Sequence, residues 1–488
     1  MPRGVVYDLL VIGGGINGAG IARDAAGRGL STILVERDDL ASATSSSSSK
    51  LIHGGLRYLE QYEFKLVREA LAEREILLRI AGHLVWPARF VMPHVPELRP
   101  RWMIRVGLFL YDHLARRSLL PGSQAVRLDT APYSSGLKPE LRHGFIYSDC
   151  RVDDARLVVA NAFDARLRGA RVLTRTECRS AKRQDSRWRA RLSNGEEIEA
   201  KAIVNAAGPW VKQVLNGRLG QPSRDLVRLV RGSHILVPKL YDGDHAFILQ
   251  NDDRRVIFMI PYGDLHTLVG TTDVPQHDAE SAQPSFDEVQ YLCRAVNRYL
   301  AKPVQAHDVV WRYAGVRPLY DDGTSDPSAV TRDYTLRVDD DAGAAPVLSV
   351  FGGKITTYRR LAEHVMERLQ PYLPSLKPAW TAVAPLPGSD FGAQPRVAAR
   401  DAFFARYPQI ATSTLRAIFR RHGVRADEVV GDGKLGEDYG AGLSERELRY
   451  FVDHEWARTG DDVLWRRTKC GLHMNEAQRQ RVAQVLGR

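Results

Sequence analysis

Gly13-Gly14-Gly15-Ile16-Asn17-Gly18 is the stretch that decides the fold. It directly follows the apolar run Tyr7–Gly13 and opens a second apolar segment, Ile16–Gly29, after which comes Thr32–Glu36. This order predicts strand, helix and strand, the unit that opens a doubly wound parallel sheet. The glycines at the first, third and sixth positions allow a tight turn, so a pyrophosphate can bind where the free N–H groups of a helix N-terminus favour negative charge.

Glu36 ends the second predicted strand, about 18 residues beyond Gly18, where an acidic side chain can accept hydrogen bonds from ribose hydroxyls. The glycine motif alone does not distinguish NAD from FAD, so the next segment matters. Thr44–Lys50 is rich in serine, which is typical of a flexible linker. It continues, however, into Leu51–Tyr58, a mixture of apolar, glycine and cationic residues that a solvated linker does not need. A loop that contacts the phosphates and flavin edge of a cofactor is the favoured interpretation, and a linker is the alternative.

Further along the chain, Leu66–Ile80 has apolar residues at helical spacing and predicts an amphipathic helix. Residues 232–270 contain short apolar runs between Asp and Gly turns, which predicts an antiparallel meander. The strands expected in it are Ser233–Val237, Ala246–Gln250, Val256–Ile260 and Thr267–Gly270. Ala202–Ala207 and Val347–Phe351 are apolar runs that each lead into glycine and indicate buried strands of the first sheet. The first domain is then discontinuous, and the meander is inserted into it.

The C-terminal part of the chain has a different composition. Six prolines with little periodicity lie from Pro371 to Pro395, which is typical of a linker that crosses a surface. Beyond it, Phe403–Arg421 shows helical spacing, and Ser444-Glu445-Arg446-Glu447 fits a capping box before Leu448–Trp456. These patterns predict a small all-α domain at the end of the chain.

Composition indicates a globular protein of two or three domains, because 44% of the 488 residues are hydrophobic and 26% are charged. The four cysteines form no C-x-x-C pair and the 14 histidines show no metal-ligand spacing, so neither a disulfide framework nor a metal site is expected. A reducing cytoplasm is the expected compartment. The net charge of +11 favours an anionic partner, and nucleic acid, acidic lipid and a phosphorylated substrate are the candidates. The alternative is that the charge only keeps the protein soluble and has no specific partner.

The sequence predicts contact with a membrane but no span across it. The N-terminus lacks a signal-peptide pattern, and no stretch reaches the roughly 18 apolar residues that cross a bilayer. Arg101–Arg117, read as a helix, places large apolar residues beside arginines, and its Trp102 and Tyr111 suit the interface between headgroups and acyl chains. A buried core helix is the alternative for this segment.

Taken together, these motifs resemble those of the aerobic, flavin-dependent glycerol-3-phosphate dehydrogenases over nearly the whole chain. The most specific stretches are Ser48–Glu60 (SSKLIHGGLRYLE) and Phe351–Arg359 (FGGKITTYR). Further segments that carry the resemblance are Gly13–Gly20, Asn205–Lys212, Gly232–Val237, Tyr313–Leu319, Asp453–Trp456 and Leu464–Lys469.

The resemblance implies an α/β plus α fold with a glutathione-reductase-like FAD-binding domain, an antiparallel-sheet substrate domain and an all-α C-terminal cap domain. The expected boundaries are 1–80, 150–231 and 340–370 for the FAD-binding domain, 81–149 and 232–339 for the substrate domain, 371–395 for the linker and 396–488 for the helical domain.

The resemblance also implies FAD bound without a covalent link. The glycine motif corresponds to the pyrophosphate turn, the serine loop lies beside the flavin, and the strand at 348–351 delivers the chain to the isoalloxazine. The implied cofactor contacts are Gly13, Gly15, Asn17, Gly18, Glu36, Ser45, Ser46, Ser47, Ser48, Ser49, Lys50, Leu51, His53, Ala207, Gly208, Trp210, Gly352, Gly353, Lys354 and Thr356.

The implied substrate is sn-glycerol 3-phosphate, which is oxidised to dihydroxyacetone phosphate. A phosphate dianion needs fixed cationic donors, and the planar fork of arginine serves best. Arg57, Arg317 and Arg332 are the candidates in family-like segments, and Tyr58 and Lys354 complete the expected substrate site.

Hydride leaves the carbinol carbon of the substrate for the flavin, and the hydroxyl must lose a proton at about the same time. Arginine is too weak a base to accept this proton. The candidates for the catalytic base are His53, His234 and Lys354, and Lys354 can also stabilise a developing alkoxide, with Arg317 as a further catalytic candidate. The sequence does not choose among them.

The expected electron acceptor is a membrane quinone, with the enzyme in the cytoplasm and peripheral on the inner face of the cell membrane, held to anionic lipid. A glycerol-3-phosphate oxidase that uses dioxygen is the nearest alternative, and an amine or amino-acid oxidase of the same fold is another. A flavin-bearing protein that binds nucleic acid is not expected, because no stacking platform of aromatic and basic residues occurs. The oligomeric state stays open between a monomer and a homodimer.

Overall fold

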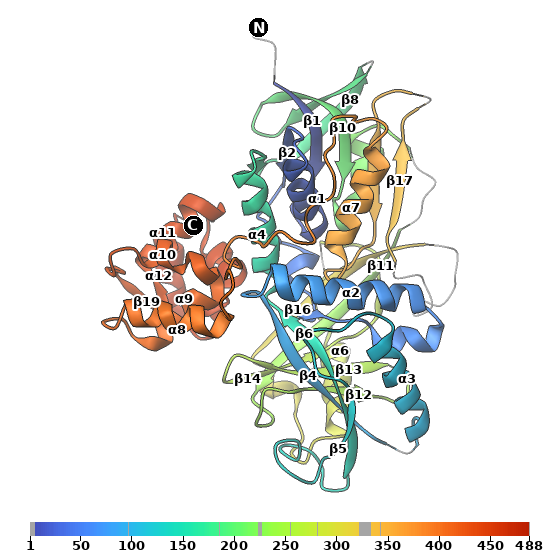
Figure 1. The fold of residues 1–488 in the computed structure, drawn as a ribbon, viewed down its shortest axis with the longest axis vertical. Helices are drawn as coiled ribbons and strands as arrows, with labels where there is room; N and C mark the ends of the chain where they lie inside the picture. The colour runs from blue at the N-terminus through green and yellow to red at the C-terminus, as the bar shows by residue number, and fades with distance from the viewer. Residues whose placement is uncertain are drawn as a thin grey trace.

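The computed structural model describes residues 5–95, 97–184, 186–222, 227–253, 255–280, 282–321, 333–341 and 343–487. Two large sheets lie one above the other along the long axis of the molecule, and a compact group of helices lies beside the first sheet, next to α4 (Asp154–Leu167) (Figure 1). Among the described residues, no helix is both long and apolar enough to cross a membrane.

The first sheet has eight strands in the order β17-β18-β10-β1-β2-β7, with β9 pairing on β10 and β8 on β9. Its strands are β1 (Val6–Ile12), β2 (Thr32–Val35), β7 (Arg171–Leu173), β8 (Cys178–Gln184), β9 (Arg187–Leu192), β10 (Glu197–Asn205), β17 (Thr335–Asp339) and β18 (Val347–Phe351). β1, β2, β7, β10 and β18 are parallel. The predicted opening unit and the two later buried strands therefore belong to one sheet, as the sequence indicated.

Side chains on β1 alternate between two cores. Leu9 and Val11 pack with the helices on one face, whereas Leu10 and Ile12 pack with Trp188 of the β8–β9 hairpin on the other. Both faces of the parallel sheet are thus covered, which explains why its strands are apolar throughout. The helices on the first face are α1 (Ile16–Gly27), α4 and α7 (Tyr358–Leu369).

The second sheet has ten strands in the order β15-β11-β14-β13-β12-β4-β6-β3, with β16 on β11 and β5 on β6. Its strands are β3 (Leu51–Ile52), β4 (Val85–Pro93), β5 (Gln124–Arg127), β6 (His143–Val152), β11 (Val227–Pro238), β12 (Ala246–Gln250), β13 (Val256–Tyr262), β14 (His266–Gly270), β15 (Val274–Gln276) and β16 (Trp311–Tyr320). The predicted meander is correct for β12, β13 and β14, but β11 pairs with β14 and not with its sequence neighbour β12.

Helices cover both faces of the second sheet. α6 (Phe286–Asn297) packs on one face, and α2 (Phe64–Ile80) and α3 (Arg101–His113) contribute to the core on the other. The predicted helix at 66–80 is confirmed as α2. On α3, Ile104, Leu108 and Tyr111 are buried, so the helix is half core and half surface.

Tyr111 corrects one sequence prediction, because it does not lie at a surface that lipid headgroups can reach. Its side chain is only 3% exposed, and its hydroxyl donates to the Asp149 carboxylate at 2.7 Å and accepts from the Gly54 N–H at 2.8 Å. A phenol with a buried carboxylate partner is more stable inside the protein than in an interface. Trp102, by contrast, is 67% exposed.

The chain crosses four times between the two sheets, after β2, β6, β10 and β16. The loops that follow β2 and β10 leave the carboxyl ends of adjoining parallel strands, where open α/β sheets bind ligands. The first crossing ends earlier than the expected domain boundaries imply, because Leu51–Ile52 already pairs with β6 in the second sheet. The segment 44–50 therefore bridges the two sheets.

The C-terminal helices have their own core. They are α8 (Arg396–Arg406), α9 (Thr412–His422), α10 (Ala426–Val430), α11 (Glu445–Glu455) and α12 (Glu476–Val485). The spacing at 403–421 is divided between α8 and α9, because Pro408 disfavours helical conformation at the residue before it. The segment 371–395 runs from α7 over the first sheet's helices to α8 (Figure 1), and Trp380 Nε1 donates to the Asp24 backbone oxygen at 3.2 Å.

The predicted capping box at the start of α11 is half formed. Ser444 Oγ accepts from the Glu447 N–H at 3.3 Å, but the Glu447 carboxylate binds Arg421 and His422 instead of the cap backbone. The Arg421 guanidinium together with the His422 ring binds a buried carboxylate more strongly than one backbone N–H does.

Candidate active site

The glycine turn between β1 and α1 has no room for larger residues. Gly13 has φ +110°, and a Cβ there would lie 2.5 Å from the Ala206 backbone oxygen; a Cβ on Gly18 would lie 1.8 Å from the Gly13 oxygen. A Cβ on Gly15 would meet only Ser45 Oγ, at 3.1 Å, so this glycine faces open space. Gly15 provides no side-chain cap for α1; Ser45 Oγ accepts from the Ile16 N–H, and the N-terminus of the helix borders the open space, where its dipole favours a pyrophosphate.

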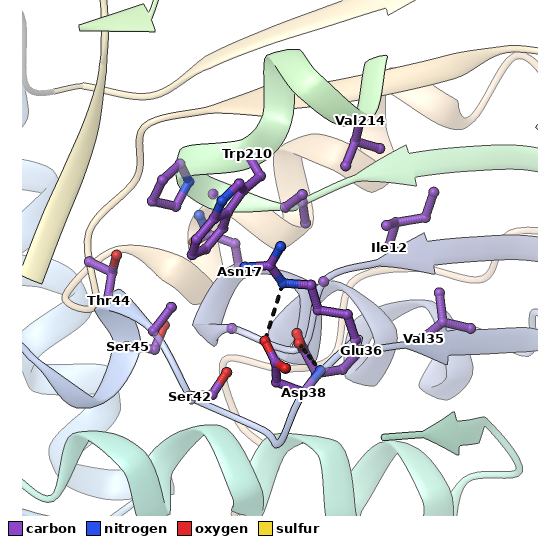
Figure 2. A pocket seen from close by; sticks show the side chains of 18 of the residues that line it. Ile12, Asn17, Val35, Glu36, Asp38, Ser42, Thr44, Ser45, Trp210 and Val214 are labelled. Carbon is purple, nitrogen blue, oxygen red and sulfur yellow. Dashed lines mark hydrogen bonds and ion pairs between the residues drawn. The ribbon is translucent and has the colours of Figure 1, made fainter. Parts of the chain in front are cut away.

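A long cleft extends from this turn between the ends of β1, β2 and β10. Figure 2 shows Ser42, Thr44 and Ser45 along one side, Ile12, Val35 and Val214 along the other, and Trp210 over them. Asn17 donates through Nδ2 to the Gly352 oxygen at 3.1 Å, while its buried Oδ1 has no hydrogen-bond partner in the described part of the chain. The open glycine turn and this unpartnered buried acceptor fit a bound dinucleotide such as FAD.

Glu36 lies at the adenosine end expected for that dinucleotide, with both carboxylate oxygens bound to backbone. Oε2 accepts from the Gly14 N–H at 2.5 Å and Oε1 from the Asp38 N–H at 2.8 Å, and burial raises the pKa of Glu36. Each oxygen has further lone pairs, so a ribose contact stays a prediction. At the mouth of the cleft, the Arg37 guanidinium stacks 4.2 Å from the Trp210 ring.

The serine loop contributes side chains to two different spaces. Ser45 lines the dinucleotide cleft, where its Oγ accepts from the Ile16 N–H at 2.9 Å. Ser47, Ser48 and Ser49 line a second cavity on the side of the second sheet. Ser46 and Lys50 line neither space: Ser46 Oγ donates to the Ala43 oxygen at 3.3 Å, and Lys50 Nζ to Asp154 at 2.6 Å. Gly18 also is not among the residues that line the cleft, so cofactor contacts of Ser46, Lys50 and Gly18 stay predictions.

The second cavity adjoins the first, since both are lined by Thr44, Pro318, Gly352 and Gly353. It contains most of the predicted catalytic and substrate residues. They are His53, Arg57, Tyr58, His234, Arg317 and Lys354, and the predicted cofactor contacts Leu51 and Thr356 line the cavity as well. The prediction for Arg332 falls outside the described residues. Arg255 of the β12–β13 turn also lines the cavity, and sequence reasoning missed it because no motif surrounds it.

Arg317 lies on β16 with its guanidinium held in one orientation. It forms an ion pair with Asp273, and Nη2 donates to the Thr272 oxygen at 2.9 Å and to Thr271 Oγ1 at 3.3 Å. Gly232 on the neighbouring strand β11 provides the space, because a Cβ there would lie 2.0 Å from Nη2. These contacts use three of the five N–H donors of arginine and leave two for a ligand.

His234 and Lys354, two of the predicted base candidates, have different surroundings in the cavity. His234 is 3% exposed, stacks 4.9 Å from the Tyr313 ring and shares a 2.9 Å hydrogen bond with Ser49 Oγ. Burial, with smaller contributions from Lys50 and Arg317, lowers the pKa of His234 to about 3, so this ring is neutral at physiological pH. Lys354 Nζ lies 4.2 Å from the centre of the Tyr58 ring.

His53 is half-buried in the same cavity. Its backbone N–H donates to Thr356 Oγ1 at 3.4 Å, and its ring lies edge-on to Phe258 at 6.1 Å. The cavity thus combines four cationic side chains, one carboxylate and two histidines beside the dinucleotide cleft. This arrangement suits a small anionic substrate that loses a proton and a hydride.

Residues 8–359 match the family model of FAD dependent oxidoreductases, and residues 379–487 match that of the C-terminal domain of alpha-glycerophosphate oxidase. The fold resembles a glycerol-3-phosphate dehydrogenase from Bacillus halodurans solved in complex with FAD, with a TM-score of 0.74 and 26% identity, over 99% of this chain and 94% of that one.

Three curated relatives are similar over almost their full length. A glycerol-3-phosphate dehydrogenase from Pseudomonas aeruginosa is 53% identical, over 99% of this chain and 96% of the relative, and the aerobic glycerol-3-phosphate dehydrogenase of Escherichia coli is 51% identical, over 98% and 97%. A D-erythritol 1-phosphate dehydrogenase from Brucella abortus is 49% identical, over 97% and 96%. The chain belongs to the FAD-dependent oxidoreductases and, within them, to the family of the aerobic glycerol-3-phosphate dehydrogenases, with FAD as its cofactor.

Proposed function

We propose that this protein oxidises sn-glycerol 3-phosphate to dihydroxyacetone phosphate and passes the electrons to a membrane quinone. Bound FAD supplies the hydride acceptor, and the protein supplies binding, orientation and the removal of a proton. One observation carries the proposal: the cavity with Arg57, Arg317 and Lys354 adjoins the dinucleotide cleft at Gly352 and Gly353. A substrate whose phosphate is held by these cations has its carbinol carbon near the shared wall.

Arg317 and Lys354 suit different parts of the substrate, because their side chains differ in geometry and in surroundings. The fixed guanidinium of Arg317 can donate to a phosphate oxygen without reorganising, whereas the Lys354 ammonium is a point charge that suits a single developing alkoxide. Asp273 prevents the Arg317 fork from rotating, and its negative charge also discourages a second anion from entering. The site therefore favours one phosphate at a set distance from the reacting carbon.

We infer that His53 accepts the proton of the substrate hydroxyl. A group with a pKa near 3, as in His234, holds a proton too weakly to act as a base near neutral pH. His53 is half-buried and lines the same cavity, beside the wall shared with the dinucleotide cleft. Neutral His234 instead binds Ser49 and keeps the serine loop against β11.

Anaerobic titration of the purified yellow protein tests the proposed reaction. Stoichiometric sn-glycerol 3-phosphate should bleach the flavin absorption, while glycerol without phosphate should not, because it lacks the group that the cations bind. A His53→Gln variant should bleach at least about a hundredfold more slowly, within the range of general-base contributions. Bleaching of this variant at the wild-type rate would exclude His53 as the base.

The proposed quinone acceptor requires contact with a membrane, and the exposed face of α3 is the surface we propose for it. Trp102, Val106 and Phe109 are 67%, 52% and 61% exposed and recur at helical spacing on one face. Arg101 and Arg105 are exposed beside them, as anionic headgroups require. In Figure 1, α3 lies on the side of the molecule away from the C-terminal helices.

Flotation with anionic liposomes tests this surface. The wild type should float, with partial release in high salt, whereas a Val106→Ser/Phe109→Ser variant should stay at the bottom of the gradient. Leu265→Ser is a matched control, since this residue is 64% exposed on the β13–β14 turn. Equal flotation of all three proteins would refute the assignment of α3.

Two second candidates have specific support. The C-terminal family match is described from an oxidase, so dioxygen is the alternative acceptor. The Brucella abortus relative makes D-erythritol 1-phosphate the alternative substrate, which has one more carbon and hydroxyl. Reoxidation rates of the reduced enzyme with a quinone and with dioxygen distinguish the acceptors, and the ratio of kcat/KM for the two phosphates distinguishes the substrates.

A further inference from the structure

One buried carboxylate, that of Asp154, connects three separate parts of the molecule. It belongs to the first residue of α4, and its side chain is 0% exposed. Oδ2 accepts from Ser48 Oγ at 2.7 Å and from Lys50 Nζ at 2.6 Å, both in the serine loop. Oδ1 lies 3.9 Å from Nζ of Lys469, which belongs to the C-terminal helical domain.

Two lysine side chains face the single carboxylate of Asp154. Burial by itself would raise the pKa of Asp154, but the charges of Lys50 and Lys469 and the hydrogen bond from Ser48 bring the pKa below its usual value. Lys469 has only 16% of its side chain exposed, and burial lowers its pKa. The carboxylate is therefore ionised and compensates both ammonium groups, and the Asp153 carboxylate adds to the compensation of Lys469, since an unpaired buried charge is strongly unfavourable.

Both lysines have a backbone conformation that is unusual for them. Lys50 has φ +60° and Lys469 has φ +89°, in the left-handed region that favours glycine. Such a conformation is unfavourable for a residue other than glycine. Two residues in different domains thus adopt an unfavourable conformation, and their ammonium groups lie near the same carboxylate, where Lys469 Nζ also donates to the Trp465 oxygen at 2.6 Å.

The contacts of Asp154 continue into the substrate cavity. Lys50 Nζ also donates to the Ser46 oxygen at 2.5 Å and lies 4.9 Å from the centre of the Tyr313 ring. The Tyr313 hydroxyl donates to the Ser48 oxygen at 2.8 Å, and the same ring stacks on His234, the partner of Ser49. The serine loop is therefore fixed at Ser46, Ser48 and Ser49, between the dinucleotide cleft and the second cavity, where the substrate is proposed to bind.

We propose that Asp154 and Lys469 are positioning residues through which the C-terminal helical domain fixes the serine loop at the active site. The docking of that domain then does more than cover the first sheet: it completes the conformation in which Ser45 and Ser47 to Ser49 line the two spaces. The activity measurements in the test rest on the proposed function. The flavin measurements do not, because the serine loop also lines the dinucleotide cleft.

A second ion pair between the same two domains provides a matched control. Arg175, in the turn after β7, binds the Asp462 carboxylate at 2.7 Å. Asp462 keeps Arg466 as a partner when Arg175 is removed, and Arg175 has no contact with the serine loop among its described interactions. Arg175→Met therefore weakens domain docking without removing a contact of the loop.

The test compares full-length holoenzymes carrying Lys469→Met, Lys469→Arg, Asp154→Asn and Arg175→Met. The measurements are the visible circular dichroism of bound flavin, the Kd of the apoprotein for FAD, kcat and KM, and the melting temperature. Lys469→Met should change the flavin dichroism and lower kcat at least about tenfold with little change in KM, because a displaced loop misplaces the reacting groups. Lys469→Arg should restore both, and Arg175→Met should leave both at wild-type values.

The proposal is overturned if Lys469→Met, fully loaded with FAD, keeps the wild-type flavin dichroism and kcat. It is also overturned if Arg175→Met causes the same changes as Lys469→Met, since domain docking in general would then explain them. Asp154→Asn should reproduce the Lys469→Met effect. If Asp154→Asn fails to fold, the comparison of the two Lys469 variants with Arg175→Met still tests the proposal. If the wild type is not bleached by glycerol phosphate, the proposed function fails, while the dichroism and the Kd for FAD still test the positioning role.

Discussion

Arg317→Ala should remove the proposed main phosphate contact and the ion pair that Asp273 forms with Arg317. A hydrogen bond to a charged group contributes up to about 3 kcal/mol, and each 1.4 kcal/mol is a factor of about ten. The Asp273 carboxylate, 14% exposed and no longer paired with Arg317, adds repulsion toward a phosphate dianion. We therefore expect kcat/KM for sn-glycerol 3-phosphate to fall by at least about a hundredfold, mostly through KM.

Steady-state kinetics with an artificial acceptor measure this effect, and the ratio of flavin to protein absorbance is the control. FAD content should stay normal, because Arg317 lines the substrate cavity and not the dinucleotide cleft. Adding Asp273→Asn to Arg317→Ala should recover part of the loss, since it removes the repulsion. Unchanged kinetics in Arg317→Ala, or a double variant worse than the single one, would refute this reasoning.

Three further predictions follow from the cofactor cleft and the helical core. Acid precipitation should release the yellow colour into the supernatant, as FAD is predicted to be bound without a covalent link; colour in the pellet would contradict this. Gly18→Ala should yield protein almost free of FAD, because the added Cβ would lie 1.8 Å from the Gly13 oxygen, and a normal flavin-to-protein ratio would show that the turn can adjust. Burial by itself would raise the pKa of Glu447, but Arg421 and His422 lower it from 4.5 to about 2. The ionised Glu447 should therefore stabilise the fold by about 3 kcal/mol above pH 4.5 and lose that contribution as the pH falls toward 2. Chemical denaturation of Glu447→Gln and wild type should therefore differ at pH 7 and converge near pH 2, and a constant difference would disprove the ionic explanation.

The parts of the fold that follow from local periodicity could be predicted from the sequence. The apolar runs at 202–207 and 347–351 and the strand before the glycine turn have the pattern of buried parallel strands. In the structure these strands pair in one sheet. The pairing of β11 with β14 could not be predicted, because alternation along a strand does not specify its neighbour. The break between α8 and α9 could have been predicted from Pro408.

The candidate site was predictable where motifs are long and unpredictable where single residues act through space. The stretch 48–60 brought His53 and Arg57 into the cavity as expected. Asp273 and Arg255 stand in short turns without a pattern, so only the folded structure reveals them. Lys50 was expected to contact the cofactor, but its partner Asp154 is 104 residues away in sequence. No spacing rule indicates an ion pair of that separation.

Anaerobic titration of the flavin with sn-glycerol 3-phosphate, followed by mixing with a quinone in liposomes, tests the central claim most directly. We predict full bleaching by one equivalent of sn-glycerol 3-phosphate, a much slower response to D-erythritol 1-phosphate, and return of the flavin bands faster with quinone than with dioxygen. A flavin that sn-glycerol 3-phosphate leaves oxidised would contradict the proposed reaction, and equal reoxidation by dioxygen would contradict the proposed acceptor.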